Sequence, residues 1–144
     1  MENIVISRPK SFNYLEEAVE YCIKNNIVQN IHSARVSIPT LFTKMNNNRF
    51  YWKVDLLLSK KYWAGWFEGL TKSFLSVKIP KLLVMAGPER MDKELTIAHM
   101  QGKFKLVNIP DTGHFIHEDN YKGFSETAKT FIKIFKIGEE LIFK

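Results

Sequence analysis

The sequence of 144 residues has little cysteine and no long apolar segment. Its single cysteine, Cys22, excludes an internal disulfide and a zinc site built from several cysteines. No run reaches the ~18 apolar residues that predict a membrane helix, and the start, MENIVISRPK, lacks the basic and apolar regions of a signal peptide. These absences predict a soluble protein with no membrane partner, located in the cytoplasm or the nucleus.

Motifs for nucleic-acid binding are missing as well. The sequence has no P-loop, no zinc-finger spacing and no RNP-like aromatic motif. Its 21 basic and 15 acidic residues give a net charge of +6, but lysines are interleaved with acids in most windows. A solvated surface explains this charge better than a nucleic-acid-binding face, so we expect no nucleic-acid partner.

The remaining composition is that of a globular protein. Hydrophobic residues make up 45% and charged residues 25% of the chain, which are ordinary values. Helical spacing predicts a helix over 11–25 with Ser11 as its cap, and a second helix from Ile31 that Pro39 interrupts. Cys22 falls on the apolar face of the first helix, so we interpret it as a packed small hydrophobe and not as a catalytic thiol.

The middle of the chain is rich in aromatic residues. Residues 50–57 are predicted to be extended, and residues 59–75 are predicted to form a helix capped by Ser59. A stripe on this helix could pack into a core or line a substrate groove, and both interpretations stay open. The stripe consists of Tyr62, Trp63, Trp66, Phe67, Leu70 and Phe74.

The second half of the chain predicts a βαβα unit. Short apolar runs bounded by proline or glycine predict buried parallel strands at 81–86 and 104–109, with a helix at 93–101 between them. Asp119 is predicted to cap a last helix, with Phe124, Ala128, Phe131, Ile132 and Phe135 facing inward. We therefore divide the chain into a helical region, 1–78, and a βαβα region, 79–144.

The strongest candidate for chemistry is His114, which follows the second strand directly. Ligands bind at the carboxyl ends of strands in open α/β sheets, and a neutral imidazole can accept and return a proton near pH 7. Glu89 or Asp92 could orient this histidine, although Asp92 could equally cap the helix at 93–101. A metal site at His114 and His117 is disfavoured, because no third ligand is evident. No Gly-x-Ser-x-Gly is present to supply a nucleophile.

Several segments together resemble the C-terminal half of the protein phosphatase methylesterases. They are RPKSF (8–12), SARVS (33–37), KYWAGWFEGL (61–70), IPKLL (79–83), DKELTI (92–97), MQGKF (100–104) and the run from Gly113 to Asp119. The resemblance covers residues 8–135, and this chain is shorter than the family at 42–58. It implies an α/β-hydrolase fold, of which this chain holds the C-terminal part with cap helices before residue 79 and an incomplete parallel sheet.

The resemblance also implies a function. Family members are serine esterases that remove the methyl ester from the C-terminal leucine of the type-2A protein phosphatase catalytic subunit, without a metal or other cofactor. His114 matches the family's catalytic histidine, whereas the serine and the aspartate of the triad lie outside this chain, so Glu89 and Asp92 lose their support. Met100, Trp63 and Trp66 are the expected contacts to the phosphatase. The alternative is a fragment that binds the phosphatase without catalysis.

Overall fold

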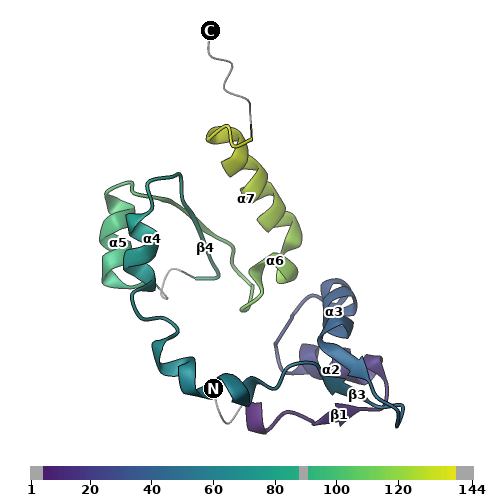
Figure 1. The fold of residues 1–144 in the computed structure, drawn as a ribbon. Coiled ribbons are helices and arrows are strands. Elements are labelled where there is room, and N and C mark those ends of the chain that lie inside the picture. Colours follow the sequence, from purple (N-terminus) through teal and green to yellow (C-terminus); the bar gives the residue numbers. More distant parts are fainter. Residues whose placement is uncertain (1–4, 88–90, 139–144) are drawn as a thin grey trace. The chain divides into compact units, whose positions relative to one another are not determined.

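The computed structural model describes residues 5–87 and 91–138, and it divides the chain into two compact units. Unit 1 is Met1–Leu70 and unit 2 is Thr71–Lys144. Unit 1 combines helices with a small antiparallel sheet, and unit 2 combines helices with a small parallel sheet (Figure 1). The assignment of 1–78 to a cap and 79–144 to a hydrolase core stays a prediction.

The sheet of unit 1 has three short strands in the order β1-β3-β2. Strand β1 (Ser11–Phe12) and strand β2 (Phe42–Lys44) each pair antiparallel with β3 (Phe50–Trp52). The predicted helix over 11–25 is therefore wrong at its start, since α2 spans Leu15–Lys24. Ser11 is not a cap, because its hydroxyl accepts a hydrogen bond from Arg49 Nε at 2.9 Å. The reason is non-local: Phe12 pairs with Phe50 across the sheet and is buried.

Two helices pack with this sheet around one aromatic cluster. Helix α3 (Ile31–Ser37) is capped by the Asn30 side chain. It ends just before the short 3-10 helix η1 (Ile38–Leu41), which contains Pro39, so the helix from Ile31 is interrupted near this proline as predicted. The Phe12 ring meets the Phe42 ring edge-on at 5.4 Å, and Phe42 lies 4.3 Å from Trp52. The other buried members of the core are Ala18, Val19, Cys22, Val28, Ala34 and Ile38. Cys22 is fully buried in this core, as expected for a packed small hydrophobe, and this burial raises the pKa of its thiol.

The predicted continuous helix over 59–75 is wrong. Asp55 instead caps a 3-10 helix, η2 (Leu56–Gly65), and Ser59 lies within it. A turn containing Gly69, at φ 72°, separates η2 from α4 (Leu70–Ser76). The predicted aromatic stripe is therefore divided: Tyr62 and Trp63 lie in η2, Trp66 and Phe67 in the turn, and Leu70 and Phe74 in α4. None of the described residues in η2 or α4 is buried.

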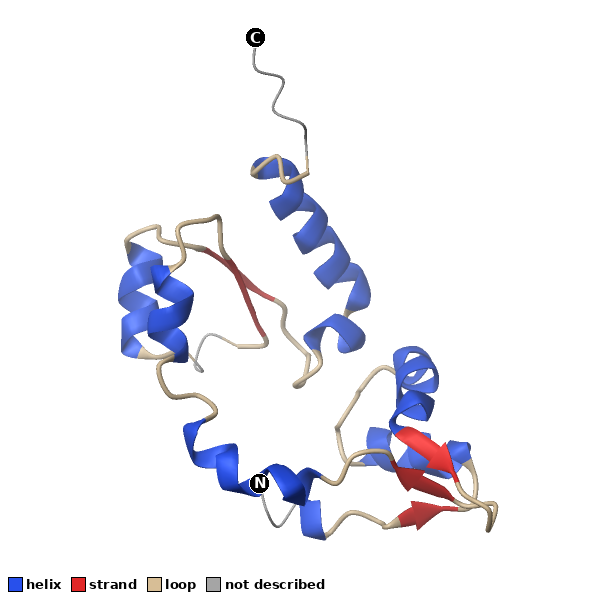
Figure 2. Cartoon of the chain, viewed as in Figure 1, coloured by secondary structure: helices blue, strands red, loops and turns tan. Residues whose placement is uncertain are grey.

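Unit 2 contains the predicted βαβα arrangement (Figure 2). Strand β4 (Leu82–Met85) pairs parallel with β5 (Lys105–Asn108), and α5 (Lys93–Met100) connects them. Beneath α5, Ala98 and Phe104 are buried, and the Phe74 ring of α4 meets Phe104 edge-on at 5.3 Å. Within the described residues the parallel sheet has two strands, which agrees with the expected incomplete sheet.

The last predicted helix is present but begins differently. A short helix, α6 (Ile116–Asp119), precedes α7 (Tyr121–Ile134). Asn120 caps α7 by accepting a hydrogen bond from the Gly123 N–H at 3.0 Å, so Asp119 is not the cap. The predicted inward face of this helix is wrong in part: none of the described residues of α7 is buried, and Ile132 and Phe135 are exposed. No helix in the described parts of the chain is long and apolar enough to span a membrane.

The core of unit 1 can be tested with two valines. Val28 is 1% exposed in the core, whereas Val36 is 76% exposed on α3. We expect Val28→Ala to lower the free energy of unfolding by about 1.5–3 kcal/mol, because it removes two buried carbons and leaves a void. The matched change Val36→Ala should stay within about 0.5 kcal/mol of the wild type in urea unfolding. Equal effects of the two changes would contradict the assigned core.

The cap of α5 predicts a pH dependence. A hydrogen bond from the Leu95 N–H, and then one from the Thr71 hydroxyl, hold the pKa of Asp92 below its ordinary value of 3.8. The stabilisation by this carboxylate is therefore complete above pH 3.8 and is lost as the pH falls toward the lower, folded-state pKa. Asp92→Asn keeps a cap that does not titrate. We expect this variant to lose less melting temperature than the wild type as the pH falls below 3.8, measured by circular dichroism. Asp92→Ala should lower the melting temperature at neutral pH too, and an unchanged profile in both variants would refute the assignment.

Candidate active site

His114 lies at the carboxyl end of the parallel strands of unit 2. The chain leaves β5 at Asn108, and His114 is exposed on the loop that leads to α6. With Val84, Met85 and Ala86 at the end of β4, it lines a hollow of about 180 Å³ that Gly113 and Ile116 complete. An imidazole in this position can exchange protons with a group that enters the hollow.

Hydrogen bonds to the backbone fix the loop that carries His114. The Ile109 N–H donates to the Met85 carbonyl at 2.8 Å, which extends the pairing of the strands by one step beyond Asn108. The Thr112 hydroxyl then donates to the Ile109 carbonyl at 2.8 Å, and Asp111 adopts a φ of 57° to make the turn. These contacts hold the loop close to the end of the sheet.

A second anchor comes from the helix that follows the loop. The Gly113 N–H, next to His114, donates to Asp119 Oδ2 at 2.7 Å in a partly buried setting. Asp119 occupies the last turn of α6, where its own N–H donates to the Phe115 carbonyl at 2.8 Å. The loop is thus closed on itself over six residues by a charge-assisted hydrogen bond. Sequence reasoning missed this role, because an aspartate before a helix is more often its cap.

Of the two acids proposed from the sequence to orient His114, the structure describes only Asp92, and it has a different role. Both carboxylate oxygens of Asp92 are engaged at the start of α5: Oδ1 accepts from the Leu95 N–H at 2.7 Å, and Oδ2 accepts from the Thr71 hydroxyl at 2.8 Å. Asp92 is therefore a helix cap, which was the second interpretation of this residue. Glu89 lies outside the described residues. No contact between His114 and a carboxylate is seen within residues 5–87 and 91–138.

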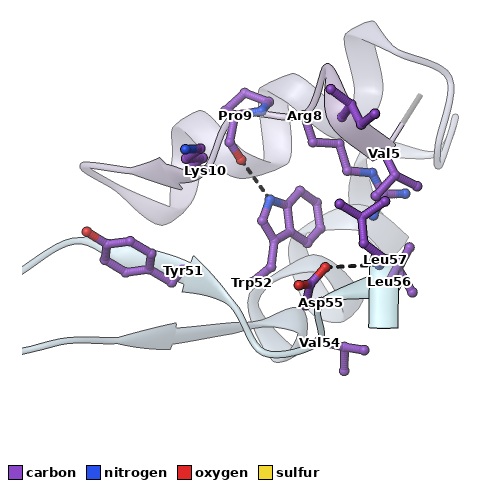
Figure 3. Close-up of a pocket in the computed structure, with 11 residues that line it drawn as sticks. Val5, Arg8, Pro9, Lys10, Tyr51, Trp52, Val54, Asp55, Leu56 and Leu57 are labelled. Atoms are coloured by element: carbon purple, nitrogen blue, oxygen red, sulfur yellow. Dashed lines mark hydrogen bonds between the residues drawn. The ribbon is translucent and has the colours of Figure 1, made fainter. Parts of the chain in front are cut away.

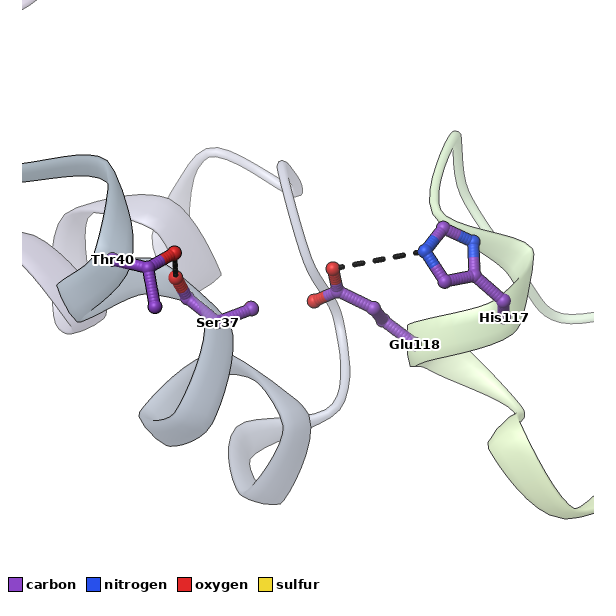
Figure 4. A network of polar contacts seen from close by, with 4 residues as sticks. All are labelled: Ser37, Thr40, His117 and Glu118. Atoms are coloured by element: carbon purple, nitrogen blue, oxygen red, sulfur yellow. Dashed lines mark hydrogen bonds and ion pairs between the residues drawn. The ribbon is translucent and has the colours of Figure 1, made fainter. Parts of the chain in front are cut away.

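The neighbouring histidine has a different environment (Figure 4). Nε2 of His117 lies 3.9 Å from Oε1 of Glu118 on α6, and its ring contacts those of Phe115 and Phe124. The same figure shows the Thr40 hydroxyl of unit 1 donating to the Ser37 carbonyl at 2.6 Å. In the described part of the chain, no group of three histidine, cysteine, aspartate or glutamate residues could hold a metal.

The expected partner-binding residues lie on the surface of their units. Met100 ends α5 with 82% of its surface exposed, and Trp66 follows η2 with 47% exposed. Trp63 is half-buried, because its Nε1 donates to the Ser59 hydroxyl at 2.9 Å and its ring lies 6.4 Å from that of Trp66. Exposed methionine and tryptophan side chains are common in protein interfaces.

Comparison with curated proteins gives one consistent group of relatives. The chain is 39% identical over 131 residues to the probable protein phosphatase methylesterase 1 of Caenorhabditis elegans, covering 91% of this chain and 36% of the relative. It is 42% identical over 120 residues to protein phosphatase methylesterase 1 of Yarrowia lipolytica, covering 83% of this chain and 29% of the relative. No protein-family model matches the chain.

The mammalian relatives are longer within the matched region. The alignment with protein phosphatase methylesterase 1 of Bos taurus has 34% identity over 175 positions and covers 92% of this chain and 46% of the relative. Because 92% of 144 residues is about 132, about 43 of those positions have no counterpart here. The chain therefore spans between about a third and a half of the curated relatives it matches.

Solved structures identify the fold. A Mycobacterium tuberculosis esterase superposes with a TM-score of 0.63 at 16% identity, covering 92% of this chain and 46% of the esterase. A second structure of the same esterase gives a TM-score of 0.61 at 16% identity, covering 92% of this chain and 47% of the esterase. These neighbours have the α/β-hydrolase fold, of which this chain forms about half. The chain is thus a homologue of part of the protein phosphatase methylesterases, with the type of fold that the sequence predicted.

Proposed function

We propose that this chain is the histidine-bearing part of a carboxylic ester hydrolase that removes the methyl ester from the C-terminal leucine of the type-2A protein phosphatase catalytic subunit. The names of its relatives support methylester hydrolysis. The observation that carries the proposal is the position of His114, exposed beside a hollow at the carboxyl end of two parallel strands. Active sites of open α/β folds lie at this end of the sheet.

In the proposed reaction, His114 moves protons. As a neutral imidazole it accepts the proton of a serine hydroxyl while that oxygen attacks the ester carbonyl. The resulting imidazolium returns the proton to the leaving methoxide, which departs as methanol. The leucine is then held as an ester on the serine. His114 deprotonates a water molecule that attacks this ester, and the imidazolium gives the proton to the serine oxygen as the leucine carboxylate is released. These reaction steps require no metal and no organic cofactor.

The serine and the triad acid are supplied from outside these 144 residues. The sequence has no Gly-x-Ser-x-Gly, and that motif gives the nucleophile of an α/β-hydrolase its strained, exposed position. Asp92 is occupied as the cap of α5, so it is not available to orient the imidazole. What this chain contributes is the base and the loop that holds it.

A second candidate function is binding of the phosphatase without catalysis. The exposed Met100 and the pair Trp63 and Trp66 favour it, because these side chains can contact a protein partner in the absence of a nucleophile. In this view the partner is the same phosphatase subunit, in the cytoplasm or the nucleus. The two functions differ in a single measurable property, the hydrolysis of the ester.

A chimera tests the esterase function. The 144 residues would replace the matching segment of the Caenorhabditis elegans relative, whose remaining chain supplies the other residues. We expect this chimera to hydrolyse the methyl ester of a phosphatase-tail peptide, and His114→Ala to lower kcat by about 10³-fold or more, as expected for a triad member. Labelling by a serine-reactive phosphonate should fall in parallel.

The controls separate catalysis from folding. His117→Ala, three residues away on the same segment, should retain most of the activity of the chimera. The isolated 144-residue chain should show no turnover. Turnover by the isolated chain that disappears on His114→Ala would overturn the assignment of the nucleophile to outside residues, and an active His114→Ala chimera would overturn the role of His114.

The anchor at Asp119 gives a prediction for the isolated chain. Asp119→Ala removes the acceptor of the Gly113 N–H, so we expect the hydrogen exchange of that amide to accelerate about tenfold or more. Asp119→Asn keeps an acceptor and should give a smaller change, and Glu118→Ala, one residue earlier, should leave it unchanged. Measurement by NMR of the labelled chain decides, and equal exchange in all variants would show that this bond does not hold the loop.

A further inference from the structure

A second site is present in unit 1, within the segment RPKSF that the proposed reaction does not use. Arg8, Pro9 and Lys10 form one wall of a cavity of about 370 Å³, and Trp52 forms another (Figure 3). The remaining lining is mostly aliphatic, for example Leu56 and Leu57 at the start of η2. Cavities that bind small molecules have this character: apolar walls with a few polar groups.

The guanidinium of Arg8, which lines this cavity, has one buried donor without an acceptor in the described part of the chain. Its Cζ lies 5.0 Å from the centre of the Trp52 ring, so the flat face of the cation is covered by the indole. Its Nε is buried and has no hydrogen-bond acceptor among the described residues. A buried donor without an acceptor is unfavourable, and an arginine donor more so because it is charged. The group is therefore arranged to receive an acceptor in the plane of the guanidinium.

The surrounding contacts hold Arg8 and Trp52 in this arrangement. Trp52 Nε1 donates to the Pro9 carbonyl at 2.9 Å, which ties strand β3 to the residue that follows Arg8. Trp52 also packs against Phe42 in the core of the unit. The ring and the cation are thus positioned before any ligand arrives, which reduces the entropy lost on binding.

The charges that line the cavity favour an anion. Among the described residues of the lining, Arg8 and Lys10 are cations and Asp55 is the single acid, so these residues carry one net positive charge. Asp55 is already engaged, since its Oδ1 accepts the Leu57 N–H at 2.9 Å as the cap of η2.

We propose that this cavity is a binding site for a carboxylate carried on an apolar body. A carboxylate can accept two parallel hydrogen bonds from one guanidinium, while its hydrocarbon part removes the aliphatic walls from water. Two sources share this chemistry: the C-terminal carboxylate of a peptide that ends in an apolar residue, and an acidic side chain of a protein. The site is independent of ester hydrolysis and needs no reaction for its detection.

The test is an NMR titration of the full, isotope-labelled chain with 4-methylpentanoate and with its neutral analogue 4-methylpentanamide. We expect saturable chemical-shift changes of the Trp52 indole N–H and of the Arg8 Nε–H at millimolar carboxylate. The amide should bind at least about tenfold more weakly than the carboxylate. Added salt should weaken binding of the carboxylate. If the amide binds as tightly as the carboxylate, or if the chemical-shift changes are confined to other residues, this titration of the wild-type chain alone overturns the proposal.

Variants then assign the site to Arg8. Arg8→Gln should weaken carboxylate binding about tenfold or more, and Arg8→Lys, which keeps the charge but loses the planar donors, should lie between. Arg35→Gln removes the same charge from an exposed position on α3 and should have no effect. Unchanged binding in a folded Arg8→Gln variant would overturn the assignment. N-acetyl-leucine compared with the α-amide of N-acetylglutamate distinguishes the two sources, and failure of both to bind would contradict the proposal.

Discussion

The parallel pairing of β4 with β5 is the interaction on which unit 2 depends. It brings Leu82 beside Lys105 and Met85 beside Asn108, although these residues are far apart in sequence. The bond from the Ile109 N–H to the Met85 carbonyl continues the pairing past the last strand residue. The end of β4 and the loop after β5 therefore lie side by side, and the hollow beside His114 exists because they do.

Anchoring of that loop is a matter of backbone hydrogen bonds and not of burial. His114 is exposed, and few residues of unit 2 are fully buried, with Ala98, Phe104 and Ile109 among them. A loop with little apolar contact keeps its shape when its polar groups are paired. The Gly113 N–H with Asp119 and the Thr112 hydroxyl with Ile109 supply such pairs. Pre-organisation of a catalytic group by fixed neighbours is a general requirement of enzyme sites.

Unit 1 follows a different principle, because an aromatic cluster organises it. Phe12, Phe42 and Trp52 come from three different strands and meet in one core. The Trp52 ring that packs in this core also lies 5.0 Å from Cζ of the Arg8 guanidinium. A single side chain thus links the stability of the unit to its cavity, and both depend on the short antiparallel sheet.

The sequence by itself determined the parts that depend on local signals. Apolar runs bounded by proline and glycine gave β4 and β5, the Asp92 cap marked the start of α5, and His114 was recognised because it follows a strand directly. The resemblance to methylesterases, confirmed by the relatives, rested on segments spread over most of the chain.

Only the tertiary structure decided the features whose partners are remote. Phe12 became a strand residue because Phe50 pairs with it, and Arg8 acquired its place because Trp52 lies against it. The spacing of apolar residues predicts the local helix or strand preference of a segment. The positions of Phe12 and Arg8 depend instead on residues about forty positions away along the chain.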